Sequence, residues 1–122
     1  MSARYKLLSI ILFCAIYSVA CARYVVHPGA VNKSDSVAYD ALLVAGAVID
    51  QSKAEMTAGG LPESLKPALN NLIDNYNRAR IVWVAYRGAV KTGNSVNNSG
   101  LETAINAMNA SLGALQSARS IP

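Results

Sequence analysis

The chain has 122 residues, a formal net charge of +4 and only two cysteines. This length suits one domain, and two cysteines exclude a small scaffold built on several disulfides. From Cys21 onward there are 9 Lys and Arg against 7 Asp and Glu, so 9 − 7 gives +2. The remainder of the chain is therefore only weakly basic.

Residues 1–21 have the three parts of a secretory signal. Arg4 and Lys6 form a positive start, residues 7–16 are almost wholly apolar, and residues 17–22 end in small side chains. The apolar run is shorter than the roughly 20 residues that a membrane span needs. We therefore expect a signal peptide that is removed, and for an exported chain of low charge we expect no nucleic-acid partner.

The sequence around Cys21 is compatible with three kinds of processing. Preceded by Ser18-Val19-Ala20, it resembles the processing site of a bacterial lipoprotein, and this resemblance implies cleavage before Cys21 and lipid on its thiol. A second interpretation is that Ala20-Cys21-Ala22 serves as an A-x-A site and releases a soluble protein that begins at Arg23. A third is an uncleaved signal anchor.

Residues 22–34 are expected to form a tether ahead of a helical domain over residues 35–122. His27-Pro28-Gly29 is a typical turn sequence. Ser34 or Asp35 is expected to be the N-cap of the first helix of the domain.

Three amphipathic helices are predicted after the tether. The first covers residues 35–57 and ends at Gly59-Gly60. The second runs from about Ser64 to residue 92, with Pro67 in its first turn, and the third begins at Leu101. The predicted buried faces are Ala38, Leu42, Ala45, Ile49, Ser52 and Met56, then Leu65, Leu69, Leu72, Tyr76, Ala79, Trp83, Tyr86 and Val90, then Leu101, Ile105, Met108, Leu112 and Leu115.

These patterns predict an all-α protein with an N-terminal signal helix followed by a three-helix up-down-up bundle. Each helix has one apolar face, and three such helices bury their faces most simply against one another. A homo-oligomer formed through leftover surface is the alternative. Trp83, in the middle of the longest seam, is expected to be the largest buried side chain.

The sequence contains no catalytic, metal or cofactor motif. His27 is the only histidine and has no ligand at metal-binding spacing, so we interpret it as a solvated turn residue. Asp50, Glu55, Glu63 and Asp74 are expected on solvated helix faces. No cofactor and no catalysis are predicted.

A basic stripe on the second helix is the one surface feature that suggests a ligand. Arg80, Arg87 and Lys91 are spaced to share a face, near Trp83 and with no acid between residues 75 and 101. They would meet anionic lipid or an anionic envelope polymer. The simpler interpretation, which we expect to hold, is a solvated outer face.

The stretch from His27-Pro28-Gly29 through residues 39–45 also resembles small bacterial lipoprotein-like envelope proteins with a helical mature region, a group of uncharacterised function. The resemblance implies a membrane partner through lipid on Cys21, and a place in the cell envelope facing the periplasm or exterior. We expect a structural or protein-interaction role. The alternative is a binding module for an apolar ligand or anionic polymer, which an open cavity near Trp83 would favour.

Overall fold

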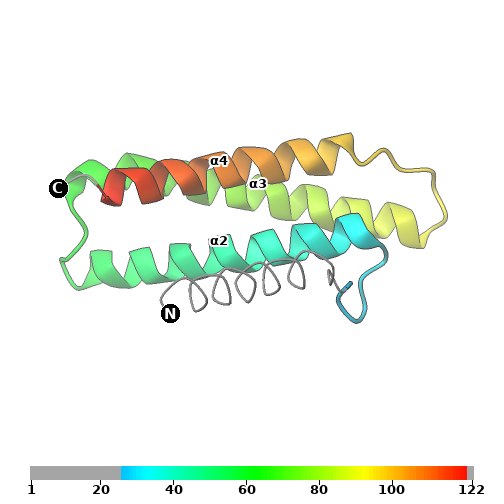
Figure 1. The fold of residues 1–122 in the computed structure, drawn as a ribbon, viewed down its shortest axis with the longest axis horizontal. Coiled ribbons are helices and arrows are strands. Elements are labelled where there is room, and N and C mark those ends of the chain that lie inside the picture. The colour runs from blue at the N-terminus through cyan, green and yellow to red at the C-terminus, as the bar shows by residue number, and fades with distance from the viewer. Residues whose placement is uncertain (1–25, 121–122) are drawn as a thin grey trace, which may run out of the picture.

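The computed structural model describes residues 26–120. They form three α-helices, α2 (Lys33–Thr57), α3 (Lys66–Lys91) and α4 (Ser99–Arg119), with a short 3-10 turn, η1 (Glu63–Leu65), ahead of α3 (Figure 1). The all-helical prediction is confirmed for this part of the chain. Cys21, the predicted signal and the first part of the predicted tether lie outside the described residues.

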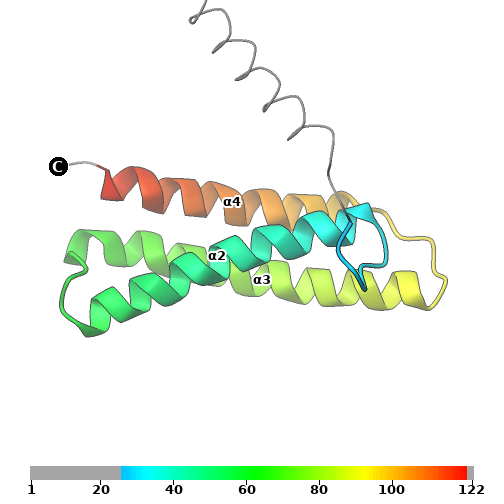
Figure 2. The same cartoon turned by 60° about the horizontal axis from the view of Figure 1, so that its bottom comes forward.

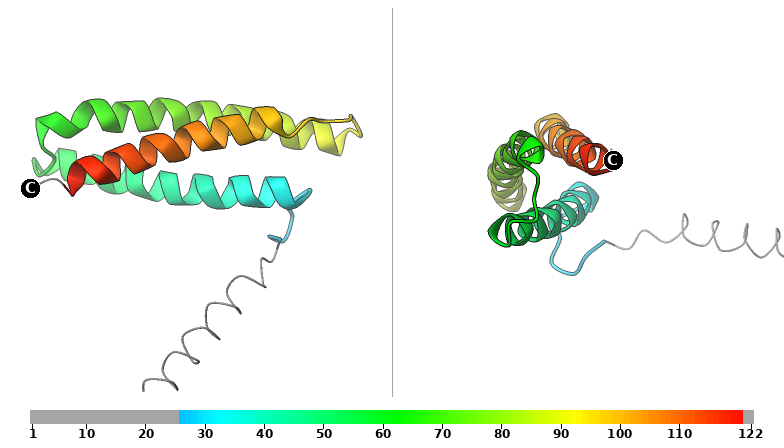
Figure 3. Two further views of the ribbon diagram at one scale, coloured as in Figure 1. Left: turned by 45° about the horizontal axis from the view of Figure 1, so that its top comes forward. Right: turned by 90° about the vertical axis from the view of Figure 1, so that its left-hand side faces the viewer.

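The three helices lie side by side, and consecutive helices run in opposite directions (Figures 1 and 2). Each helix contacts both of the others. Seen from one end, they enclose a shared interior (Figure 3). This arrangement places the start of α2, the end of α3 and the start of α4 at one end of the molecule.

Helix α2 begins at Lys33, two residues earlier than predicted, and its N-cap is Asn32 rather than Ser34 or Asp35. The Asn32 side-chain oxygen accepts a hydrogen bond from the backbone amide of Asp35 at 2.9 Å. The Asp35 carboxylate accepts one from the amide of Val31 at 2.8 Å. The two bonds satisfy two amides at the helix start, and they place Asp35 inside the first turn.

Helices α2 and α3 both end at a glycine with positive φ, as the sequence predicts for Gly59. Gly59 and Gly93 each have φ of 78°. The amides of Gly59 and Gly60 bond back to Met56 and Glu55, and α3 ends in the same hydrogen-bond pattern. These are Schellman endings, in which a residue without a Cβ adopts the left-handed conformation at little cost.

The core consists mainly of the predicted seam residues. The buried apolar residues are Ala38, Leu42, Ala45, Ile49, Leu61, Leu65, Leu69, Leu72, Ala79, Tyr86, Leu101, Ile105, Met108, Leu112 and Leu115. Four of the predicted seam residues are not buried: Met56 is exposed, and Tyr76, Trp83 and Val90 are only partly buried. Met56 lies in the last turn of α2, whereas Trp83 lies at the edge of the α2–α3 contact. Between residues 26 and 120, no helix is long and apolar enough to span a membrane.

Candidate functional site

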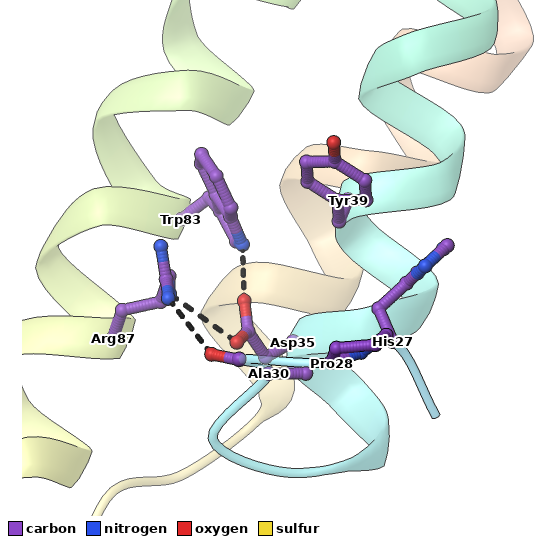
Figure 4. A pocket seen from close by; sticks show the side chains of 8 residues that line it. His27, Pro28, Ala30, Asp35, Tyr39, Trp83 and Arg87 are labelled. Carbon is purple, nitrogen blue, oxygen red and sulfur yellow. Dashed lines mark hydrogen bonds and ion pairs between the residues drawn. The ribbon is translucent and has the colours of Figure 1, made fainter. Parts of the chain in front are cut away.

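The strongest candidate site lies at the end of the molecule where the chain enters the helices. A hollow of about 270 Å³ opens there between the turn at residues 27–30, the first turns of α2 and the C-terminal half of α3 (Figure 4). Its lining residues are His27, Pro28, Gly29, Ala30, Asp35, Tyr39, Trp83 and Arg87. Titratable and aromatic side chains from separate parts of the chain therefore meet at one place.

The turn that forms one wall has the sequence His27-Pro28-Gly29-Ala30. The Ala30 amide donates a hydrogen bond to the His27 carbonyl at 3.1 Å, and Gly29 has φ of +84°. Proline followed by a residue with positive φ is typical of a type II turn. The predicted turn is confirmed, and the turn aims the Gly29 carbonyl at α3.

Asp35 is the centre of the cluster and is only 2% exposed. One carboxylate oxygen accepts a hydrogen bond from the Trp83 indole nitrogen at 2.5 Å. The other accepts from the Val31 amide and lies 3.2 Å from Nε of Arg87. A buried carboxylate is costly unless it is paired and hydrogen-bonded, and Asp35 has both kinds of partner.

Arg87 connects α3 to the turn. Its Nη2 donates a hydrogen bond to the Gly29 carbonyl at 3.2 Å, and its guanidinium lies 5.2 Å from the centre of the Trp83 ring. The guanidinium is thus held by a carboxylate, a carbonyl and an aromatic face. Arg87 acts here as a fixed part of the fold.

His27 folds back against α2, and its side chain, although 39% exposed, makes contacts there that its interpretation as a solvated turn residue did not include. Its backbone amide donates to the Ser36 hydroxyl at 3.0 Å, and its ring nitrogen contacts the Asp40 carboxylate. The imidazole also meets the Tyr39 ring edge to face, with 5.0 Å between centres. The described residues of the predicted tether therefore pack onto the helical domain.

A second polar layer lies beside the hollow and joins α2 to the loop before α4. The Tyr86 hydroxyl accepts a hydrogen bond from the Asn32 side-chain nitrogen and donates one to the Asn98 side-chain oxygen, both at 2.7 Å. Asn98 in turn donates to the Ser34 hydroxyl at 3.1 Å. Tyr86, predicted only as a core residue, thus also carries polar contacts among three chain segments.

The polar groups of the cluster contact one another across chain segments. Both oxygens of Asp35 have partners, and the lining residues include no Ser, Thr or Cys. The described residues also contain no group of three or more His, Cys, Asp or Glu placed to hold a metal ion. What the hollow offers a ligand is the partly exposed rings of Tyr39 and Trp83, which are tilted to each other with centres 6.1 Å apart.

The three cations of the predicted basic stripe have different surroundings in the structure. Arg87 belongs to the Asp35 cluster, whereas Arg80 is exposed, lies 5.9 Å from the Tyr76 ring and lines a different hollow. Lys91 is exposed in the last turn of α3. Arg87 is therefore set apart from Arg80 and Lys91 by its pairing with Asp35.

The carboxylates singled out in the sequence are spread over the molecule. Glu63 pairs with Lys66 at 2.5 Å, and Glu55 pairs with Arg119 at 3.2 Å. Asp50 and Asp74 are exposed. Sequence reasoning missed the role of Asp35, which was expected only as a helix cap. The one sequence feature that indicates this role is an acid in the first turn of one helix together with a Trp and an Arg on the same face of a later helix.

Comparison with protein-family models, curated proteins and solved structures finds no match for this chain.

Proposed function

We propose that this protein is an exported, envelope-tethered helical module with a structural or protein-interaction role and no catalysis. The supporting observation is that the polar groups of His27, Asp35, Arg87 and Trp83 already have partners in other chain segments. A site built for catalysis aims such groups at a bound substrate. Here they fasten the incoming chain to α2 and α3.

The proposed architecture is a signal over residues 1–21 followed by a three-helix up-down-up bundle. The antiparallel order of α2, α3 and α4 supports this topology, as do their short connections. The buried face of each helix meets the other two, which accounts for most of the large apolar residues. A homo-oligomer is not needed to cover these faces.

The proposed attachment is lipid on Cys21. Acyl chains add about 0.8 kcal/mol of membrane affinity per buried methylene, and stable anchoring takes more than one chain or a second signal. Mass analysis of the mature N-terminus in a cell with bacterial lipoprotein processing distinguishes a lipidated Cys21 from a chain that begins at Arg23 and from an uncleaved chain.

Cys21→Ser provides the matching functional test. We expect this variant to leave the membrane fraction, whereas Cys14→Ser, which changes the apolar run of the signal, should stay membrane-bound like the unmodified chain. If Cys21→Ser remains in the membrane fraction, the protein is held by an uncleaved signal anchor and the lipid proposal is wrong.

The hollow near Trp83 supports a second candidate function, a binding module for a small apolar ligand. The carboxylates and cations around it are paired with one another, so an ionic ligand would have to displace existing contacts. A neutral ligand with a flat apolar face needs only the rings of Tyr39 and Trp83.

The fluorescence of Trp83, the only tryptophan, reports on this hollow directly. Bromobenzene is a suitable probe because its bromine quenches a nearby indole. Binding predicts saturable quenching that Tyr39→Ala weakens, relative to Leu43→Ala, a change at an exposed residue one turn away on α2. Quenching that rises linearly without saturation, as for a free tryptophan analogue, would show that the hollow binds no apolar ligand.

A further inference from the structure

The outward side of α3 exposes large apolar side chains that the helix packing leaves uncovered. Ile81 is 70% exposed and Val84 is 59% exposed, the two highest values among the exposed large hydrophobic residues of the described chain. Ile81 stands between two hollows, one of about 530 Å³ toward α4 and one of about 550 Å³ on its other side. Exposed apolar surface of this kind marks contact with a partner or a membrane.

Basic side chains flank this apolar strip on both sides. Arg78 lines the hollow toward α4, and Arg80 lines the other hollow. At about 100° per residue, Arg78 lies roughly 60° to one side of Ile81 and Arg80 roughly 100° to the other. Lys91 lies farther along the same helix, on the Arg80 side. We call Arg78, Arg80, Ile81, Val84 and Lys91 the α3 ridge.

The ridge has basic residues but no acid. No Asp or Glu occurs in residues 75–101, and the α4 residues that line the adjoining hollow are uncharged. The nearest acid on this side of α3 is Asp74, about 10 Å before Ile81 along the helix axis. Arg87 is excluded from the ridge because it is paired with Asp35.

We propose that the α3 ridge lies on an anionic lipid surface. Ile81 and Val84 would enter the headgroup boundary, and Arg78, Arg80 and Lys91 would meet lipid phosphates. An apolar strip flanked by Lys and Arg is the pattern of helices that lie in the plane of a membrane interface, and anionic lipid attracts such cations. A second copy of the chain fits less well, because its equivalent ridge would bring cations to cations.

The point where the chain enters the domain supports this orientation. The Gly29 carbonyl is 3.2 Å from Arg87 of α3, so the incoming chain meets α3 in its C-terminal half. Cys21 is five residues before Val26, which an extended chain spans in at most about 18 Å. This step depends on the proposed lipid on Cys21: such an anchor would hold the ridge close to the bilayer and raise its effective concentration there.

Site-specific photocrosslinking in the full chain tests the proposal. p-Benzoylphenylalanine replaces Ile81, and in a matched protein it replaces Asn109, an exposed residue of α4. Both proteins are mixed with vesicles of phosphatidylcholine and phosphatidylglycerol, or of phosphatidylcholine alone, and irradiated. Mass spectrometry of the modified peptide identifies the adduct, and sedimentation measures vesicle association separately.

We expect lipid adducts at position 81 with the anionic vesicles, and at least several-fold fewer at position 109. A protein that sediments with vesicles but gives no excess of lipid adducts at position 81 would overturn the ridge proposal and leave the tether intact. A protein-to-protein adduct at position 81 would assign the surface to a second copy instead. If the chain proves to lack lipid on Cys21, adducts at position 81 with added vesicles still decide the question.

A pair of charge reversals tests the electrostatic part. With the photoreactive residue at position 84, Arg78→Glu should lower the yield of lipid adducts by at least about fivefold, because each basic residue near an anionic surface contributes roughly a fivefold gain in binding. Lys53→Glu makes the same charge change on an exposed site of α2 and should leave the yield nearly unchanged. Equal losses in the two variants would show a general charge effect and contradict a specific role of the ridge.

Discussion

The two ends of the helical domain are held together in different ways. At the end where the chain enters, a buried carboxylate and a buried tyrosine hydroxyl join α2, α3 and the loop before α4 through hydrogen bonds. At the opposite end, buried leucines fill the space between the helices. The polar end requires particular partners in particular places, whereas the apolar end requires only volume and shape.

The apolar end also has polar contacts between α2 and the end of α4, but they are partly exposed. Arg119 lies 3.2 Å from Glu55 and donates a hydrogen bond to the buried Ser52 hydroxyl at 2.5 Å. Glu55 and Arg119 both keep substantial contact with solvent. Ion pairs of this kind contribute little to stability, so Leu61, Leu65 and Leu115 are expected to hold this end.

The largest effect is expected from Leu115→Ala at the apolar end. Leu115 is fully buried, and truncating such a leucine costs about 2 to 5 kcal/mol because a cavity remains. Denaturant unfolding monitored by circular dichroism measures the loss. Val44→Ala removes exposed apolar atoms from α2 and should change stability by less than about 0.5 kcal/mol. Comparable losses in the two variants would contradict this account of the core.

Asp35→Ala is expected to have the next largest effect and to show how much the polar end contributes. It removes the shared partner of Trp83, Arg87 and the Val31 amide, and should cost about 2 to 4 kcal/mol, somewhat below a fully buried pair because Arg87 is 30% exposed. Glu55→Ala at the other end should cost less than about 1 kcal/mol. Thermal unfolding compares the two, and a larger loss for Glu55→Ala would reverse our ranking of the two ends.

The apolar core along the helices was more predictable from the sequence than the polar contacts at the entry end. All five spaced apolar residues of α4, from Leu101 to Leu115, are buried as expected, because helical spacing shows directly which side chains share a face. Asp35 carries no such signal. Its hydrogen-bond partner Trp83 is 48 residues away, so the burial of the carboxylate follows from tertiary packing that no local pattern encodes. The burial of Trp83 was overestimated for the same reason.

Trp83→Phe separates hydrogen bonding from packing at the polar end. The smaller ring keeps most contacts with Tyr39 and Arg87 but loses the N–H that Asp35 accepts. We expect a loss of about 1 to 2 kcal/mol, because the bond is to a charged group. A double-mutant cycle with Asp35→Asn measures the coupling. Additive effects of the two changes would mean that the indole nitrogen contributes nothing through Asp35.

The smallest expected effects come from two helical glycines, one near the apolar end and one near the middle of α2. Gly113 is exposed on α4 with nothing within 4 Å of an added Cβ, so Gly113→Ala should stabilise the protein by about 0.5 to 1 kcal/mol. At Gly46 an added Cβ would lie 3.3 Å from the Tyr76 hydroxyl of α3. Gly46→Ala should therefore gain less than Gly113→Ala, or lose stability, because the close approach of α2 and α3 opposes the gain in helix propensity. Melting temperatures measured by circular dichroism give the difference, and an equal rise in both variants would show that α2 and α3 have room to separate between the two ends.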